Sequence, residues 1–117
     1  MRVVFDSNVY VSALTLPGGV ADSALTAVLG GRATLLLSEP MLGEVLGVLG
    51  RKFARDKEQL ARTALFLTEL AEPVECAVAG RADLIVTGDR AMLRLGRYEG
   101  VEIITLRAFL ARLESRH

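Results

Sequence analysis

The sequence has few cysteine, histidine and aromatic residues, and it carries no excess of either charge. One cysteine (Cys76) and one histidine (His117) among 117 residues exclude an internal disulfide and a zinc cluster of Cys and His ligands. The 14 Lys and Arg residues balance 14 Asp and Glu residues, which excludes a polycation that coats nucleic acid without specificity. Any contact with nucleic acid must therefore come from a local patch.

Long apolar runs are also absent. No run approaches the ~18 apolar residues that a membrane-spanning helix needs. The first apolar run stops at Asp6, before the core of a signal peptide could form. We therefore expect a soluble cytoplasmic protein with no membrane partner. With 51% hydrophobic and 24% charged residues, the chain has enough apolar material for a single domain over residues 1–117, and whole-chain disorder is excluded.

Apolar runs bounded by turn and cap residues predict strands that alternate with helices. The expected strands are 2–5, 34–37, 82–87 and 101–104, and the expected helices are 20–29, 40–50, 57–71, 90–95 and 105–115. The strand runs are continuously apolar, which is typical of a parallel sheet covered on both faces. We therefore predict an α/β fold with three layers, α/β/α, around a central, mainly parallel sheet.

Two of the expected strands end on an aspartate. Asp6 follows the first strand, and Asp89 follows the strand at 82–87. In a parallel sheet both residues would lie at the carboxyl edge, where open α/β folds bind their ligands. The alternative for each is a helix cap, a role that aspartate commonly takes.

Glu44 is a third candidate at this edge. It is the only charged residue between Glu39 and Arg51, in a helix whose N-terminus points at the same edge. Its neighbours Gly43 and Gly47 each weaken the helix by about 1 kcal/mol relative to alanine, which suggests that something packs or binds closely beside Glu44. The alternative is a glutamate that faces solvent.

Carboxylates that converge on one edge must hold a cation, shift their protonation or repel each other. Oxygen ligands without histidine or cysteine favour Mg²⁺ or Mn²⁺ over zinc. Such an ion can bind a phosphate oxygen, orient a water and stabilise the charge that develops in phosphodiester hydrolysis. A phosphatase with an aspartyl nucleophile would need a second aspartate where Asn8 stands, and no glycine-rich phosphate loop is present. The residues therefore indicate metal-dependent phosphoryl chemistry.

Three motifs contain these acids in order: VVFDSN at 3–8, LSEPMLGEV at 37–45 and LIVTGDRAML at 84–93. In these motifs the chain resembles the PIN-domain nucleases, and more narrowly the toxin component of bacterial and archaeal toxin–antitoxin pairs. The resemblance follows nearly the whole chain in order. It implies an endoribonuclease that depends on Mg²⁺ or Mn²⁺ and hydrolyses phosphodiester bonds in single-stranded RNA.

The resemblance also implies site residues and partners. The acids that match the catalytic and metal-binding acids of the family are Asp6, Glu44 and Asp89. Asn8 matches a polar residue that supports the first acid, Ser7 stands where threonine is more usual, and Thr87 belongs to the Thr-Gly-Asp motif. The expected partners are a cognate antitoxin protein, which would occupy the acidic cleft, and a second copy of the chain in a homodimer.

One family motif is missing. Members normally carry an aspartate-rich stretch that leads into a helix with Leu-Glu-Cys-Ala and contributes a further metal-binding acid, whereas here Val74 runs directly into Glu75. Glu75 matches the glutamate after the missing acid, so the metal role does not transfer to it. Either the protein has a reduced site, or a segment is absent at the 74/75 junction of this sequence. The alternative function is a PIN-like binding module that is non-catalytic or weakly active.

Basic residues follow the third acid. Arg90, Arg94 and Arg97 recur at i, i+4 and i+7, so on a helix they would form one stripe that could steer an RNA backbone. The alternative, a solvated helix face, is the more frequent role of a single arginine. The basic segment 51–57 is likewise more typical of an exposed connection than of an RNA site.

Four further residues are left out of the expected site. Phe5 and Tyr10 are expected to pack in the core or at its edge rather than to stack on bases, because aromatic residues make up only 5% of the chain. Cys76 is expected to be a small buried residue on a helix. His117 lies at a terminus and is a poor candidate for a general base.

Overall fold

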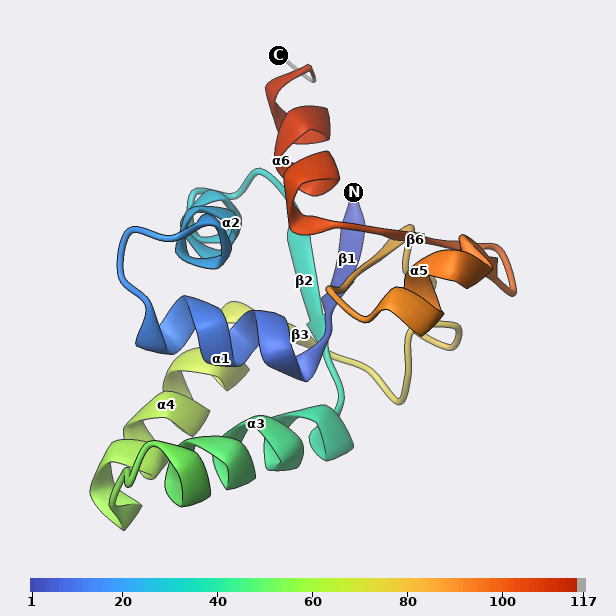
Figure 1. The fold of residues 1–117 in the computed structure, drawn as a ribbon. Helices are drawn as coiled ribbons and strands as arrows, with labels where there is room; N and C mark the ends of the chain where they lie inside the picture. The colour runs from blue at the N-terminus through green and yellow to red at the C-terminus, as the bar shows by residue number, and fades with distance from the viewer. Residues whose placement is uncertain (116–117) are drawn as a thin grey trace.

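A computed structural model describes residues 1–115 and arranges them around one six-stranded sheet (Figure 1). In chain order the elements are β1 (Arg2–Phe5), α1 (Ser7–Thr15), α2 (Val20–Leu29), β2 (Thr34–Leu37), α3 (Glu39–Lys52), α4 (Lys57–Leu70), β3 (Glu72–Pro73), β4 (Leu84–Val86), α5 (Arg90–Leu95), β5 (Arg97–Tyr98), β6 (Val101–Ile104) and α6 (Leu106–Glu114). The strand order is β3-β2-β1-β4-β6-β5, and each neighbouring pair is parallel except β5 with β6. The predicted α/β class, with three layers around a mainly parallel sheet, is confirmed.

The predicted strands and helices agree closely with the structure, and side-chain caps explain where the helices begin. Ser38 caps α3 by accepting a hydrogen bond from the Met41 amide. Asp56 and Gln59 form a reciprocal capping box at the start of α4. Thr105 caps α6 in the same way as Ser38 caps α3. These caps satisfy amides that have no partner within their helix.

Three elements were not expected from the sequence: α1, β3 and β5. β3 and β5 contain two residues each and are defined by their pairing with β2 and β6. β5 corrects one prediction, because Arg97 lies on it and not on the helix with Arg90 and Arg94. Gly96 ends α5 with a φ of 69°, a left-handed conformation that favours glycine.

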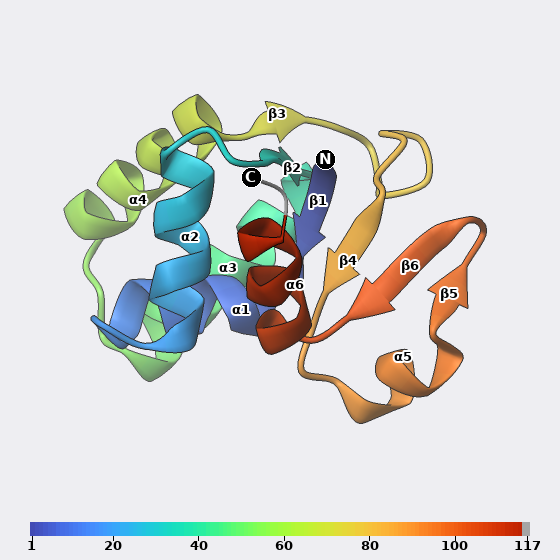
Figure 2. The same cartoon turned by 90° about the horizontal axis from the view of Figure 1, so that it is seen from above.

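The main core lies on the side of the sheet that carries α2 and α6 (Figure 2). Phe5 contacts both Tyr10 and Phe109, with ring centroids 5.7 Å apart in each pair, and all three side chains are fully buried. The expectation that Phe5 and Tyr10 pack in the core is therefore confirmed.

Within residues 1–115 no single helix is long and apolar enough to cross a membrane. Helices α1 and α2 meet the length and hydropathy criteria only as a pair, and the chain bends by 96° between them.

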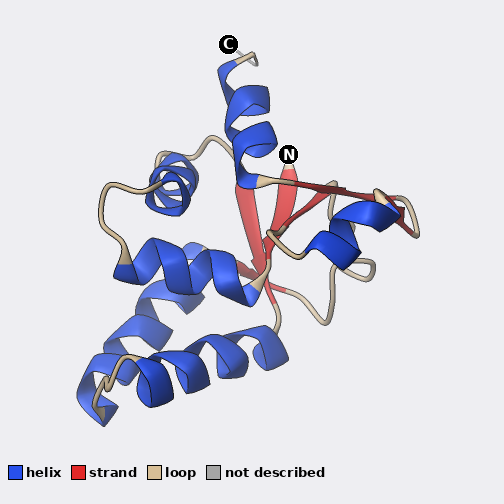
Figure 3. Cartoon of the chain, in the orientation of Figure 1, coloured by secondary structure: helices blue, strands red, loops and turns tan. Residues whose placement is uncertain are grey.

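The opposite side of the sheet is covered by the connection from β3 to β4, residues 74–83, which contains neither helix nor strand (Figures 2 and 3). It supplies Val74, Ala77 and Ala82 to a small apolar cluster with the sheet. Cys76 lies in this connection and is exposed, so the expectation of a buried cysteine on a helix is wrong. The connection forms turns instead of a helix, in which the Gly80 amide donates to the Cys76 carbonyl at 2.9 Å and the Ala82 amide to the Ala77 carbonyl at 2.9 Å.

Parallel pairing brings the ends of the central strands to one edge. Phe5 pairs with Val86 across β1 and β4, so the next residues, Asp6 and Thr87, emerge at the same level. Val4 pairs with Leu36 across β1 and β2, so Ser38 and the start of α3 also lie there. We call this side the carboxyl edge; it is where the sequence places the candidate acids.

Candidate active site

Asp6 is held in place by its backbone and by both of its carboxylate oxygens. Its amide donates to the Val86 carbonyl of β4 at 3.0 Å. Oδ1 accepts from the Ser7 amide at 2.8 Å, and Oδ2 accepts from the Thr87 hydroxyl at 2.8 Å. The hydrogen bond from the Ser7 amide caps α1, so the cap role considered for Asp6 is real. The hydrogen bond from the Thr87 hydroxyl fixes the Asp6 side chain at the end of β4, which a cap alone does not require.

Ser7 joins Asp6 to Glu44. The Ser7 side chain is buried at 4% exposure, and its hydroxyl donates to Glu44 Oε1 at 2.9 Å. Glu44 lies on α3 with its residue exposed, whereas Val45 and Leu49 of the same helix are fully buried. Glu44 is therefore directed to the carboxyl edge, and it reaches the Asp6–Ser7 turn rather than only solvent.

Thr87 joins Asp6 to Asp89. It is 1% exposed, its hydroxyl donates to Asp6, and the same oxygen accepts from the Asp89 amide at 3.0 Å. Asp89 is exposed and caps α5, with Oδ1 accepting from the Ala91 amide at 2.8 Å and from the Met92 amide at 3.3 Å. The cap role considered for Asp89 is thus real as well, and it engages the Oδ1 oxygen.

The three candidate acids form one hydrogen-bonded series. In order along the carboxyl edge it consists of Glu44, Ser7, Asp6, Thr87 and Asp89. No three Asp, Glu, His or Cys side chains within residues 1–115 come close enough together to hold a metal ion. Metal binding by all three acids therefore stays a prediction.

The donor set fits a hard cation. All side-chain groups in the series present oxygen, either carboxylate or hydroxyl, and Mg²⁺ often binds proteins through only one or two carboxylates while keeping several waters. The chemistry of the donor set is therefore compatible with a hydrated Mg²⁺ or Mn²⁺ ion.

The remaining predicted residues take no part in the series. Asn8 is exposed, and the oxygens of Asp6 receive their hydrogen bonds from Ser7 and Thr87 instead. Arg90 and Arg94 are exposed on α5, directly after Asp89, so they lie near the carboxyl edge without a contact to the acids. His117, which is left out of the expected site, falls outside the described residues.

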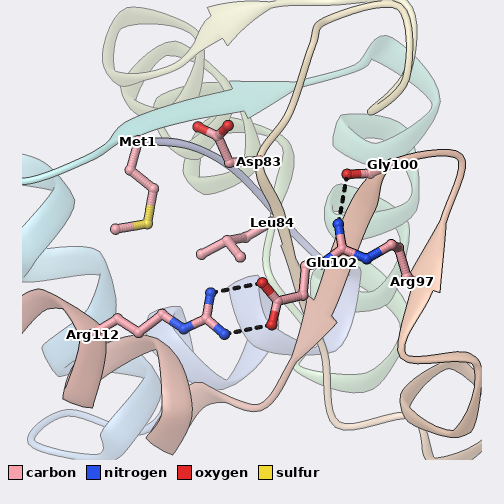
Figure 4. A pocket seen from close by; sticks show the side chains of 7 residues that line it. All are labelled: Met1, Asp83, Leu84, Arg97, Gly100, Glu102 and Arg112. Carbon is pink, nitrogen blue, oxygen red and sulfur yellow. Dashed lines mark hydrogen bonds and ion pairs between the residues drawn. The ribbon is translucent and has the colours of Figure 1, made fainter.

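A cavity of about 480 Å³ lies at the opposite, amino edge of the sheet (Figure 4). Its lining residues are Met1, Asp83, Leu84, Arg97, Gly100, Glu102 and Arg112. Arg112 forms a bidentate ion pair with Glu102, in which Nη1 donates to Oε1 at 2.8 Å and Nη2 donates to Oε2. These hydrogen bonds and the charge of Arg112 hold the pKa of Glu102 below its usual value. The cavity is therefore separate from the three candidate acids.

Comparison with known proteins identifies a protein family that the chain matches. A family model described as a PIN domain matches residues 2–74, which include Asp6, Ser7 and Glu44. The match ends at Val74, and Thr87 and Asp89 lie beyond it. A search of curated proteins finds no match.

Proposed function

The chain belongs to the PIN-domain family, whose members are generally nucleases, and we propose that it is an endoribonuclease dependent on Mg²⁺ or Mn²⁺. The proposed reaction is hydrolysis of phosphodiester bonds in single-stranded RNA in the cytoplasm. The observation that carries the proposal is the hydrogen-bonded series from Glu44 through Asp6 to Asp89. It gathers acids from three separate segments at the edge of the sheet where α/β folds bind ligands.

The residues of the series have distinct roles in this proposal. Asp6 and Glu44 would hold the ion, with Asp89 at the far end of the series. The bound ion supplies a Lewis acid and an activated water for attack on the phosphodiester. Thr87 and Ser7 orient Asp6 and Glu44, because each hydroxyl is buried and donates to one carboxylate. The exposed Arg90 and Arg94 would attract the RNA backbone toward the acids.

The resemblance supports a more specific role, the toxin of a toxin–antitoxin pair. In that role the partners are a cognate antitoxin protein, which covers the carboxyl edge, and a second copy of the chain in a homodimer. The test is copurification of the chain with the protein encoded beside it, followed by light scattering of the free chain. A free chain that stays a monomer, or a neighbour that does not suppress cleavage, would contradict this role.

A second function has its own supporting observation. No group of three acids within the described chain is close enough to hold a metal ion, and the sequence lacks the further acid expected after Val74. A PIN-like module that binds RNA without cleaving it fits these two facts. It predicts RNA binding that is unchanged by Mn²⁺ and no cleavage products.

Cleavage of an unstructured RNA with Mn²⁺ separates the two functions. For the nuclease we expect Asp6→Asn to lower the cleavage rate by more than ~100-fold, since a direct metal ligand should matter more than its supporting residues. Asparagine still caps α1, so the melting temperature should change little. Glu44→Gln should also impair cleavage, whereas the matched change Glu69→Gln on the exposed face of α4 should not. Equal rates for wild type and Asp6→Asn would contradict the nuclease assignment.

A further inference from the structure

The exposed face of α3 carries an arginine two turns after Glu44. Arg51 stands at i+7 from Glu44, so both residues lie on the same face of the helix. Side chains of a helix lean toward its N-terminus. The Arg51 side chain therefore extends back along α3 in the direction of Glu44 and of the carboxyl edge.

Gly47 provides the space that the Arg51 guanidinium occupies. A Cβ atom added at Gly47 would lie 2.8 Å from Arg51 Nη1 and 3.6 Å from its Cζ, closer than unstrained contact allows. The guanidinium thus lies on the bare backbone of Gly47, three residues from Glu44, or about 4.5 Å along the helix axis. A Cβ added at Gly43, on the other side of Glu44, would meet no atom within 4 Å. The surface of α3 is therefore open beside Glu44 at Gly43 and is occupied by the Arg51 guanidinium at Gly47.

Arg51 is not used by the fold in the way that other arginines are. The three ion pairs among residues 1–115 are Arg2–Glu72, Arg62–Glu58 and Arg112–Glu102, and Arg51 belongs to none of them. Its neighbour Arg55, by contrast, donates to the Leu14 carbonyl and ties the α3–α4 connection to α1. The exposed Arg51 guanidinium keeps its planar set of donors available for a ligand.

A planar guanidinium matches the oxygens of a phosphate, to which it can donate two parallel hydrogen bonds. We propose that Arg51 is a substrate-positioning residue that binds an RNA backbone phosphate. This phosphate is the neighbour of the scissile phosphate, which the ion proposed at Asp6 and Glu44 would bind. This contact rests on the proposed nuclease function. It also answers why glycine stands at position 47: a side chain there would push the guanidinium away from the acids.

A simpler role for Arg51 is to stabilise the C-terminus of α3, where it lies in the last turn with Lys52. Lys52→Gln is therefore the matched control, because Lys52 is exposed on the same turn but points about 100° away around the helix. Gly47→Ala separates the two roles further. Alanine favours the helix and should raise the melting temperature, yet it displaces the guanidinium and should weaken RNA binding.

Binding is measured by fluorescence anisotropy of a labelled, unstructured RNA in the Asp6→Asn background, and KM and kcat are measured in the wild-type background with Mn²⁺. We expect Arg51→Gln to raise both Kd and KM by about 10-fold, as for loss of a charge-assisted hydrogen bond. Its kcat should change less than about twofold, and its salt slope should fall by about 0.7, the value for one phosphate on single-stranded RNA. Arg51→Lys should recover part of the affinity, and Lys52→Gln should stay within about twofold of wild type.

The outcomes distinguish this contact from the function on which it rests. Wild-type cleavage together with equal KM values for Arg51→Gln and Lys52→Gln would overturn the phosphate contact alone. A Gly47→Ala variant that is more stable and binds RNA as well as wild type would also overturn it. A wild type that neither cleaves nor binds RNA would overturn the proposed function, and the contact with it.

Discussion

The two edges of the sheet both carry acids, but they use them differently. At the amino edge Glu102 is paired with Arg112, and Asp83 accepts from the Arg2 amide at 2.7 Å. At the carboxyl edge Asp6 and Glu44 accept hydrogen bonds from hydroxyl and amide groups, and neither belongs to an ion pair within residues 1–115. An arginine pairs with Glu102 at the first edge, whereas no arginine or lysine within residues 1–115 pairs with Asp6 or Glu44 at the second.

This difference separates acids that have a cationic partner in the fold from the candidate acids Asp6 and Glu44, which have none within residues 1–115. A carboxylate paired with arginine is satisfied within the protein and gains little from a ligand. A carboxylate that accepts a hydrogen bond from a neutral hydroxyl is oriented without a cationic partner, as metal-binding carboxylates commonly are. The cavity of Figure 4 lies at the amino edge. Its lining contains none of the three candidate acids, so the hydrogen-bond partners of the acids, and not the cavity, point to the carboxyl edge.

Among the changes that test this difference between the two edges, Thr87→Val should have the largest effect on cleavage. It removes the hydroxyl that links Asp6 to the Asp89 amide. We expect a cleavage rate lower by about 10–100-fold, as for other residues that orient metal ligands. The free energy of unfolding should fall by about 1–3 kcal/mol, because a buried hydrogen-bonded group is lost. Cleavage assays and urea unfolding measure the two effects.

Thr63→Val is the matched control for that change. Thr63 is also a buried threonine, but its hydroxyl donates only to the Gln59 carbonyl of its own helix. Its loss should leave cleavage unchanged and affect stability less than Thr87→Val does. If both variants cleave RNA equally well, the hydroxyl at the carboxyl edge has no role in orienting the acids.

A smaller effect is expected at the amino edge, on stability alone. The ion pair with Arg112 lowers the pKa of Glu102 in the folded protein. A carboxylate with a lowered folded pKa adds stability above its unfolded pKa, and that stability is lost as the pH falls through the folded pKa. Glu102→Gln should therefore lower the melting temperature at pH ~7, and the difference from wild type should shrink as the pH falls through the folded pKa of Glu102. Melting curves across this range test the prediction, and a pH-independent difference would contradict it.

Cleavage provides the second arm of the same experiment. Glu102→Gln should cleave RNA at the wild-type rate at pH ~7, because the ion pair lies at the edge away from the candidate acids. A loss of activity comparable to that of Asp6→Asn would remove the distinction between the two edges.

The smallest effect should come from Tyr10→Phe, in the core that lies between the edges. The Tyr10 hydroxyl is buried and has no hydrogen-bond partner within the described part of the chain, and burial raises its pKa. Removing an unpaired buried hydroxyl is neutral or stabilising by up to about 1 kcal/mol. Urea unfolding measures this change. Marked destabilisation would show that the hydroxyl has a partner, such as a buried water.

Much of the local structure follows from the sequence because its causes are local. The helix at 90–95 and the strand at 101–104 lie where the pattern predicts them, and Asp89 and Thr105 cap the helices that follow them. The pattern predicts no element for residues 7–15, where α1 forms. That segment is rich in Val and other β-branched or aromatic residues, and its helix is stabilised by the Asp6 cap and by packing on α2 and α3.

Other differences between prediction and structure arise where a predicted helix ends early or does not form. The i, i+4, i+7 spacing places Arg97 on a basic stripe only if the helix continues, and Gly96 ends it. The expectation of a helical Cys76 assumes that the residues after Val74 can form a helix. In the structure they turn sharply instead, and a Cβ at Gly80 would lie 2.7 Å from Val74 Cγ1. Close packing of this kind has no signature in the sequence.

The sequence by itself determined which residues end strands and cap helices, because hydropathy runs and capping side chains act over a few neighbours. It thereby indicated Asp6 and Asp89, and it indicated Glu44 as the only charged residue between Glu39 and Arg51. Only the tertiary structure decided how these acids are joined. Ser7 reaches Glu44 across 37 residues, and Thr87 reaches Asp6 across 81. Such contacts depend on the parallel register of β1 with β4 and on the placement of α3, which arise when the whole sheet pairs and packs.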